Sequence, residues 1–181
     1  MHFQFRPCEL EMDHEAYMNF LLQHHNELQL PYSFALKLSF ISSPLILGKA
    51  LLIFNEEPYQ IVGAAGFVYG TGANDYEDNH VCQVEIAFLQ KDYQGTLLFI
   101  HGLLALIDLI KASNPDVQQI QFWASTDNKA IKRIFSKFSN WPGSTQSIVN
   151  HMTLYSLSFH ELVLYGHRFR KSQNQLHRNE F

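Results

Sequence analysis

The sequence predicts a mixed α/β domain with a mostly antiparallel sheet and flanking helices. Three observations lead to this prediction. Residues 80–112 have the pattern of a buried strand, a short polar turn and a long apolar helix. Residues 49–69 have the pattern of two strands joined by Glu56-Glu57-Pro58, which is typical of a hairpin. Around these units the chain alternates in the order β-α-α-β-β-β-α-β-α-β-α, which favours a sheet covered by helices.

The N-terminal part is predicted to contain one strand and two helices. Residues 2–9 alternate as a strand does, and Asp13 is a candidate N-cap for a helix whose apolar spacing continues to Leu28 and which Pro31 ends or interrupts. We expect a second, shorter helix over residues 32–41. It should end at Ser42-Ser43-Pro44, because proline interrupts helical hydrogen bonding.

The part that follows the central helix is predicted to contain two strands and a helix between them. Residues 117–124 read as a strand, and Ser125-Thr126-Asp127 offers capping side chains for the next helix. Trp141-Pro142-Gly143 should end that helix. Residues 147–157 are expected to form one strand with a bend at Asn150-His151.

The C-terminal part is predicted to be a helix followed by a flexible polar tail. Ser158 and Glu161 form a capping-box pattern, so the helix should span about residues 159–171. The tail should span residues 172–181. Since no repeat or linker interrupts the chain, we expect residues 1–171 to form a single domain.

The composition excludes several classes of function. A net charge of -4 gives no support to nucleic-acid binding, which usually needs a basic surface. The longest apolar helix contains His101, Gly102 and Asp108 and is shorter than the roughly 20 residues of a membrane span. No apolar leader begins the chain, so we expect a cytoplasmic protein that does not act at a membrane. The ten histidines and two cysteines lack metal-site spacing, so no metal is predicted.

The junction between the central strand and the central helix is a candidate anion site. Residues 81–89 form the strand, residues 90–95 form the turn, and the helix covers residues 96–112. The first amides of a helix have no partners within the helix. Such amides, together with the positive end of the helix dipole, suit a phosphate group.

Four stretches of the sequence resemble motifs of one enzyme family. Phe5-Arg6-Pro7 and Asp13 are similar to its opening motif, and Ile61-Val62-Gly63 is similar to its usual hairpin motif. Residues 89–99 and 128–137 resemble its two later motifs. The order and spacing of these stretches, over nearly the whole chain, resemble the GNAT family of acyl-CoA-dependent N-acyltransferases. The resemblance implies a GNAT-like sheet with a central splayed strand flanked by helices, and a C-terminal helix.

The resemblance also implies a function and a set of cofactor contacts. The expected activity is an N-acetyltransferase that moves an acetyl group from acetyl-CoA to a small-molecule or peptide amine. In this family, backbone amides of the turn and helix start hold the CoA pyrophosphate, and the pantetheine arm pairs with the splayed strand. The corresponding positions are Phe88, Leu89, Gln94, Gly95, Thr96, Leu97, Leu98, Phe99 and Asn128.

Some positions differ from the family pattern. Gln94 stands where the family has a basic residue, and Leu97 and Phe99 stand where it has small residues. Phe135 replaces a frequent tyrosine that protonates the departing thiolate. These differences favour an alternative hypothesis, in which a catalytically impaired protein serves as an acyl-CoA sensor or interaction module.

Two residues are candidates for acid–base chemistry. Glu85 lies between apolar residues of the central strand, where burial could raise its pKa and suit it to act as a base. The alternative is a structural carboxylate that faces solvent or pairs with a lysine. Tyr155 is a candidate proton donor in place of the missing tyrosine, and the alternative is a residue that packs between strands.

The central helix needs a cover on the side that faces away from the sheet. It is apolar around most of its circumference, with one weakly polar stripe formed by His101, Ala105, Asp108 and Ala112. A helix of this kind is normally buried. The C-terminal helix and the second subunit of a homodimer are the two candidates to cover it.

Overall fold

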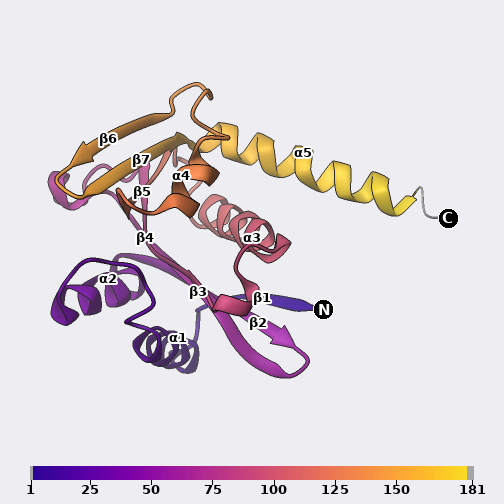
Figure 1. The fold of residues 1–181 in the computed structure, drawn as a ribbon, viewed down its shortest axis with the longest axis horizontal. Coiled ribbons are helices and arrows are strands. Elements are labelled where there is room, and N and C mark those ends of the chain that lie inside the picture. The colour runs from indigo at the N-terminus through magenta and orange to yellow at the C-terminus, as the bar shows by residue number, and fades with distance from the viewer. Residues whose placement is uncertain (1, 179–181) are drawn as a thin grey trace.

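The computed structural model describes residues 2–178 and contains a single seven-stranded sheet in this part of the chain (Figure 1). The strands are β1 (Phe3–Pro7), β2 (Gly48–Glu56), β3 (Tyr59–Tyr69), β4 (Val81–Leu89), β5 (Gln119–Ser125), β6 (Thr145–Val149) and β7 (Met152–Ser158). Their order in the sheet is β1-β2-β3-β4-β5-β7-β6. All neighbouring strands are antiparallel except β4 and β5, which are parallel. The predicted mixed and mostly antiparallel sheet is therefore confirmed.

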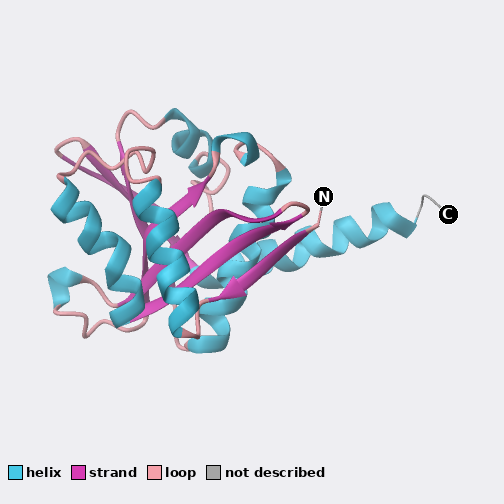
Figure 2. Ribbon diagram, turned by 90° about the horizontal axis from the view of Figure 1, so that it is seen from below, coloured by secondary structure: helices cyan, strands magenta, loops and turns pink. Residues whose placement is uncertain are grey.

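Helices cover both faces of this sheet (Figures 1 and 2). They are α1 (Glu11–Gln23), α2 (Phe34–Leu47), α3 (Leu97–Ser113), α4 (Lys129–Phe135) and α5 (Phe159–Arg178). Side chains of α1 and α2 form one core cluster with β2, β3 and β4. Side chains of α3, α4 and α5 form a second cluster on the other face. No helix within the described part of the chain combines the length and the apolar character of a membrane span.

Strand β4 separates from β5 halfway along its length. Residues 81–84 of β4 pair with residues 119–122 of β5, whereas β4 remains paired with β3 as far as Leu89. The two strands therefore diverge after Val84, which is visible in Figure 1. The expected central splayed strand is confirmed.

A β-bulge lies where this divergence begins. The register between β3 and β4 passes from Gly66 opposite Ile86 to Phe67 opposite Val84, so Glu85 is the additional residue. A Cβ atom at Gly66 would lie only 2.6 Å from Cγ of Pro44, so helix α2 can approach the sheet only because no side chain is present. Bulges of this kind redirect side chains, often beside active sites.

The predicted break at Ser42-Ser43-Pro44 is wrong, because α2 continues through it to Leu47. Pro44 cannot donate to the carbonyl of Phe40, but the Ser43 hydroxyl donates to that carbonyl at 3.5 Å. Pro44 is also buried against the sheet. Packing and a local side-chain donor thus compensate for the lost backbone hydrogen bond.

The predicted bounds of α1 also need correction. Its N-cap is Leu10, and Asp13 lies one turn inside the helix, where its carboxylate accepts from the Leu10 amide at 3.3 Å. Asp13 also pairs with Arg6 at 3.1 Å, which links the helix to β1. The helix ends at Gln23, well before Leu28 and the predicted end at Pro31.

Several boundaries differ in the C-terminal half. Helix α4 ends at Phe135, before the predicted end at Trp141-Pro142-Gly143. The expected single strand over residues 147–157 is a hairpin, because Asn150 adopts a left-handed φ of 55° and reverses the chain between β6 and β7. Asn128, rather than residues 125–127, caps α4. Helix α5 continues to Arg178, past the expected end near residue 171, and residues 179–181 of the expected tail lie outside the described residues.

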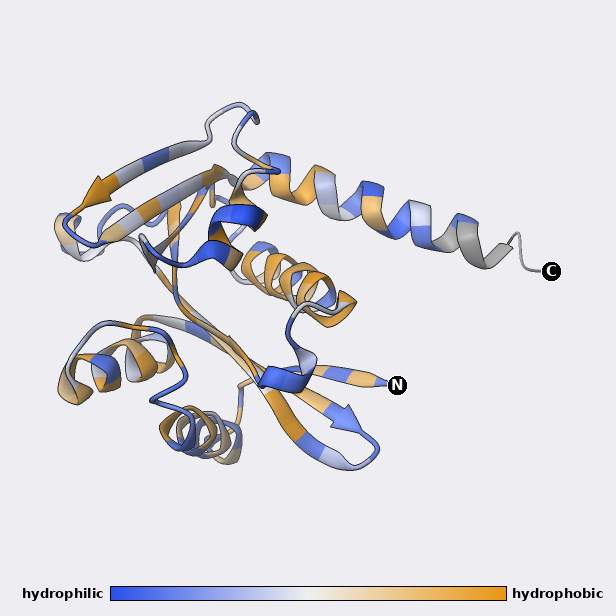
Figure 3. Ribbon diagram, viewed as in Figure 1, coloured by the Kyte–Doolittle hydropathy of each residue, from blue (hydrophilic) through white to orange (hydrophobic). Residues whose placement is uncertain are grey.

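Helix α5 covers part of α3. Gly166 of α5 lies close to Leu104, since a Cβ atom there would be 2.9 Å from Cδ2 of Leu104. His101, Asp108 and Ala112 of the predicted polar stripe remain exposed. Figure 3 shows the mostly hydrophobic α3 beside the more hydrophilic outer part of α5. Within a single chain, it is therefore the C-terminal helix α5 that packs against part of α3.

Candidate active site

The candidate site includes the edge of β4 that is not paired with β5 after Val84. The Gln90 amide donates to the carbonyl of Val62 at 2.9 Å, so alternation along the strand directs the backbone groups of Ala87 and Leu89 away from β3. They face the space from which β5 has diverged. Ala87 is exposed although it lies in a central strand. An extended ligand could therefore pair with this edge as an added strand does.

The start of α3 provides donors beside this edge. The Thr96 hydroxyl caps the helix by accepting from the Leu98 amide at 3.2 Å, and it donates to the carbonyl of Tyr93 at 2.8 Å. The amides of Gly95, Thr96 and Leu97 have no acceptor among residues 2–178. Gly95 has a φ of 73°, and nothing lies within 4 Å of the position of a Cβ atom there. These amides form an accessible anion site.

Gln94 connects the helix start to the free edge. Its side-chain amide donates to the Leu89 carbonyl at 2.8 Å, and Leu89 is one of the residues whose backbone faces the divergence. The structure thus brings Leu89 together with the segment from Gln94 to Leu97. Leu97 is 57% exposed, so its side chain flanks the open amides.

Three of the predicted cofactor residues have side chains that point elsewhere. Leu98 is buried against Ile53 and Val62, and Phe99 is half-buried in α3. The Phe88 ring lies on the opposite face of the sheet, with its centroid 5.1 Å from that of His24. Any contact that these residues make with a ligand in the divergence would therefore be through the backbone.

Asn128 bridges α4 and the segment between α1 and α2. Its Oδ1 atom accepts from the Ile131 amide at 3.0 Å, which caps α4. Its Nδ2 atom donates to the side chain of Gln29, also at 3.0 Å. Asn128 follows β5 in the chain, and Gln29 precedes β2. Their hydrogen bond therefore joins segments from the two sides of the divergence.

Glu85 lies in a narrow cleft on the α2 face of the sheet. The cleft is lined by Leu30, Tyr32, Phe40, Gln83, Val84, Glu85 and Trp123. Burial raises the pKa of Glu85, and a hydrogen bond from Gln83 at 2.6 Å acts in the opposite direction. Gln121 in turn donates to Gln83 at 2.9 Å. This amide chain holds a partly desolvated carboxylate in one orientation, which suits a general base.

Tyr155 lies on the other face of the sheet, in the cluster that contains α3 and α5. Its ring is 5.2 Å from that of Phe122 and 4.4 Å from that of Phe135, measured between centroids. Its hydroxyl is buried without a hydrogen-bond partner among the described residues. The structure therefore does not bring Tyr155 and Glu85 together, although both lie near the start of the divergence.

Most residues that line the cleft were not predicted from the sequence. Tyr32, Phe40 and Trp123 come from three separate segments, so no spacing could have grouped them. The amides of Gln83 and Gln121 were also missed. A signal did exist, because Gln83 and Glu85 are two residues apart and so point to the same side of a strand.

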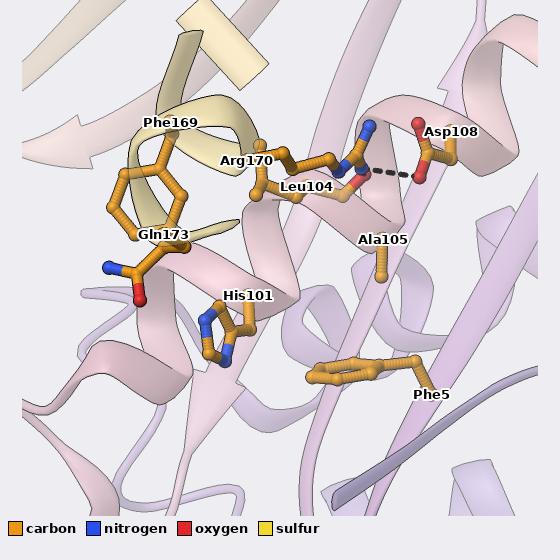
Figure 4. A pocket seen from close by; sticks show the side chains of 8 residues that line it. All are labelled: Phe5, His101, Leu104, Ala105, Asp108, Phe169, Arg170 and Gln173. Atoms are coloured by element: carbon orange, nitrogen blue, oxygen red, sulfur yellow. Dashed lines mark hydrogen bonds and ion pairs between the residues drawn. The ribbon is translucent and has the colours of Figure 1, made fainter. Parts of the chain in front are cut away.

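A larger hollow lies on the α3 and α5 face, away from this chemistry (Figure 4). It is lined by Phe5, His101, Leu104, Ala105, Asp108, Phe169, Arg170 and Gln173. Arg170 pairs with Asp108 at 2.5 Å on its rim. None of the predicted site residues lines this hollow.

No protein-family model and no curated protein matches the sequence. The fold, however, is similar to solved acetyltransferases. A GNAT-family acetyltransferase from Staphylococcus aureus Mu50 has a TM-score of 0.61 and 16% identity over 87% of this chain and 99% of its own. The nucleotide-linked sugar GNAT FdhC has a TM-score of 0.62 and 12% identity over 93% of each chain.

A third similar structure contains coenzyme A. The ribosomal L7/L12 alpha-N-protein acetyltransferase RimL, in complex with coenzyme A, has a TM-score of 0.56 and 16% identity. The match covers 86% of this chain and 93% of RimL. Each of the three structures matches this chain over more than four fifths of its length. The chain has the GNAT fold.

Proposed function

We propose that this protein is an acyl-CoA-dependent N-acyltransferase that transfers an acetyl group to an amine. The supporting observation is the continuity of the free edge of β4 with the open amides of Gly95, Thr96 and Leu97. An extended pantetheine arm suits the edge, and a pyrophosphate suits the amides. The presence of coenzyme A in RimL, which has the same fold, supports this assignment.

Glu85 would act on the acceptor. A protonated amine has no lone pair for attack, and a carboxylate with a raised pKa is suited to take the proton, directly or through a water molecule. The amine nitrogen then attacks the thioester carbonyl carbon, the C–N bond forms and the C–S bond breaks, and the nitrogen releases its second proton to water. The departing thiolate takes a proton. Tyr155 remains the proposed donor of that proton. In this role, its hydroxyl would need to reach the space between the diverging strands β4 and β5.

The test is a titration of acetyl-CoA by calorimetry, combined with an assay of thiol release over a panel of amines. Leu97→Glu would place a negative charge beside the open amides, so we expect acetyl-CoA to bind about tenfold more weakly. Leu164→Glu is the matched control, because Leu164 is also an exposed leucine in a helix but lies in α5. It should bind acetyl-CoA as the wild type does.

Two results would count against the proposal. Failure of the wild-type protein to bind acetyl-CoA would remove the acyl-CoA assignment altogether. Tight binding without thiol release for any amine would leave a CoA-binding protein that does not catalyse transfer.

A further inference from the structure

The charged residues of this chain are divided unevenly between its two ends. Residues 1–127 contain 5 of the 13 Lys and Arg residues and 15 of the 17 Asp and Glu residues, which gives a formal charge of -10. Residues 128–181 contain the other 8 basic and 2 acidic residues, which gives a formal charge of +6. The net charge of -4 therefore combines an acidic part with a basic part. Such an asymmetry indicates a surface that binds a charged partner.

The basic residues of the second part are confined to α4, the turn after it and α5. Strands β6 and β7 contribute none, because residues 138–160 contain no Asp, Glu, Lys or Arg. Arg170 pairs with Asp108 of α3. Six other basic side chains are exposed and have no ion pair among the described residues: Lys129, Lys132, Arg133, Lys137, Arg168 and Lys171. We call these six residues the basic surface.

The two helices that carry the basic surface pack together on one face of the sheet. Side chains of both belong to the core cluster that contains α3. The rings of Phe138 and Trp141, which follow α4, lie 5.5 and 5.7 Å from that of Tyr165 in α5, measured between centroids. Lys137 directly precedes Phe138, and Arg168 lies about one helical turn after Tyr165. Cations from both helices therefore flank this contact, and Figure 3 shows hydrophilic residues along both.

The basic surface is not balanced by acidic residues close to it in the chain. Two acidic residues flank its members: Asp127 before the cap of α4, and Glu161 in the first turn of α5. Six cations against two anions leave an excess of positive charge, and like charges that lie close together repel one another. A surface that serves only solubility normally mixes both signs of charge. The excess therefore favours a surface that receives anions from another molecule.

We propose that the basic surface docks an acidic polypeptide segment of a partner protein. Carboxylates of the partner would relieve the repulsion among the cations. The negative charge of residues 1–127 would repel the same partner and so direct it to α4 and α5. The inference goes beyond the proposed function, because it requires neither acetyl-CoA nor an acceptor amine.

Two other kinds of polyanion fit this surface less well. Single-stranded nucleic acids stack their bases on aromatic side chains, and no exposed aromatic side chain is described after Asn128. A long nucleic acid would also reach past the cations toward the acidic part of the molecule. A helix that binds a membrane surface needs bulky apolar residues beside its cations. Leu164 is the single exposed large hydrophobic residue that is described in α4 and α5.

The experiment measures binding of a fluorescein-labelled peptide of alternating glutamate and alanine by fluorescence anisotropy. At about 0.15 M salt, charges more than about 8 Å apart are screened, so the measurement reports local charges. Lys132→Glu combined with Arg133→Glu should weaken binding about tenfold or more. Lys49→Glu combined with Lys111→Glu is the matched control, because it changes the net charge equally at exposed lysines outside α4 and α5. It should change the affinity less than about twofold.

A milder pair of variants separates lost recognition from damage to the fold. Lys132→Gln combined with Arg133→Gln removes both charges without adding repulsion, so binding should weaken by less than in the pair of glutamates but in the same direction. A Tm equal to that of the wild type establishes that each variant is folded. Weakened binding only in variants with a lower Tm would count against a docking role.

Several further results would overturn the inference. The wild-type protein would fail to bind the peptide, or both pairs of glutamate variants would weaken binding equally. A single-stranded RNA of equal charge, or vesicles that contain phosphatidylserine, would bind more tightly than the peptide. Displacement of the peptide by coenzyme A would assign the cations to the phosphates of the cofactor instead.

Discussion

At the scale of single residues, Glu85 combines a cost to stability with a proposed role in catalysis. Burial raises its pKa from the ordinary value of 4.5, so ionisation at neutral pH is less favourable in the folded protein than in the unfolded chain. Glu85→Gln should therefore leave the Tm unchanged or higher at about pH 7 while lowering kcat about a hundredfold. Thermal unfolding and thiol release measure the two effects.

The pH dependence of this variant gives the sign of the effect. The stability contributed by a carboxyl with a raised pKa is present when it is protonated and is lost as the pH rises through that pKa. The Tm difference between Glu85→Gln and the wild type should thus shrink as the pH falls toward about 4. A variant that is less stable at neutral pH but fully active would instead make Glu85 a structural residue.

Gln83 should set the pH at which Glu85 becomes active as a base. Its hydrogen bond lowers the pKa of Glu85 against the larger opposite effect of burial. Gln83→Met removes that donor, so the pKa should rise and the acid limb of kcat/KM should move to higher pH. Gln119→Met is the control, because Gln119 also lies in the sheet but donates to Ser156. An unmoved acid limb in Gln83→Met would show that this hydrogen bond does not tune the base.

At the scale of elements, the sequence predicted those parts of the fold whose signals are local. The strand over residues 81–89 has the bounds that were expected, because its apolar run is flanked by polar turns. The break at Pro44 was wrong, because burial against Gly66 and the Ser43 hydroxyl compensate for proline inside α2. The hairpin of β6 and β7 was read as one strand, because Asn150 adopts a left-handed φ that its neighbours do not reveal.

The candidate site, too, could be predicted from the sequence only where its residues are neighbours in the chain. The start of α3 could be predicted, because a strand, a turn and a capping threonine follow one another in the chain. Glu85 was also a candidate. The cleft around it could not be predicted, because Tyr32, Phe40 and Trp123 come from three separate segments that meet only in the folded protein.

The cap of α3 supports a separate prediction. Thr96→Ala removes the acceptor for the Leu98 amide and should destabilise the protein by about 1 kcal/mol. For a chain of this length, that loss corresponds to a fall in Tm of about 2–4 °C. Thr96→Ser keeps the hydroxyl and should retain most of the stability. A Tm that is equally low in both variants would point to lost packing of the methyl group.

At the scale of the whole molecule, the sheet consists of two halves with a narrow connection. Strands β1 to β4 form one half, and β5, β7 and β6 form the other. The backbone pairing between them covers only residues 81–84 and 119–122. Hydrogen bonds from Gln121 to Gln83 and from Asn128 to Gln29, and the core cluster on the α3 face, also join the two halves. The divergence is therefore the place where backbone groups in the middle of the sheet are free to bind a ligand.

Hydrogen exchange should show whether coenzyme A occupies this divergence. Coenzyme A should slow exchange of the amides of Ala87, Leu89 and residues 95–97, because each would gain an acceptor or lose access to water. Pantetheine, which lacks the pyrophosphate, should protect Ala87 and Leu89 but leave residues 95–97 unprotected. The free edge of β6 is the internal control, because it is exposed yet lies outside the divergence. Protection of β6 by coenzyme A, or equal protection of residues 95–97 by both ligands, would contradict this arrangement.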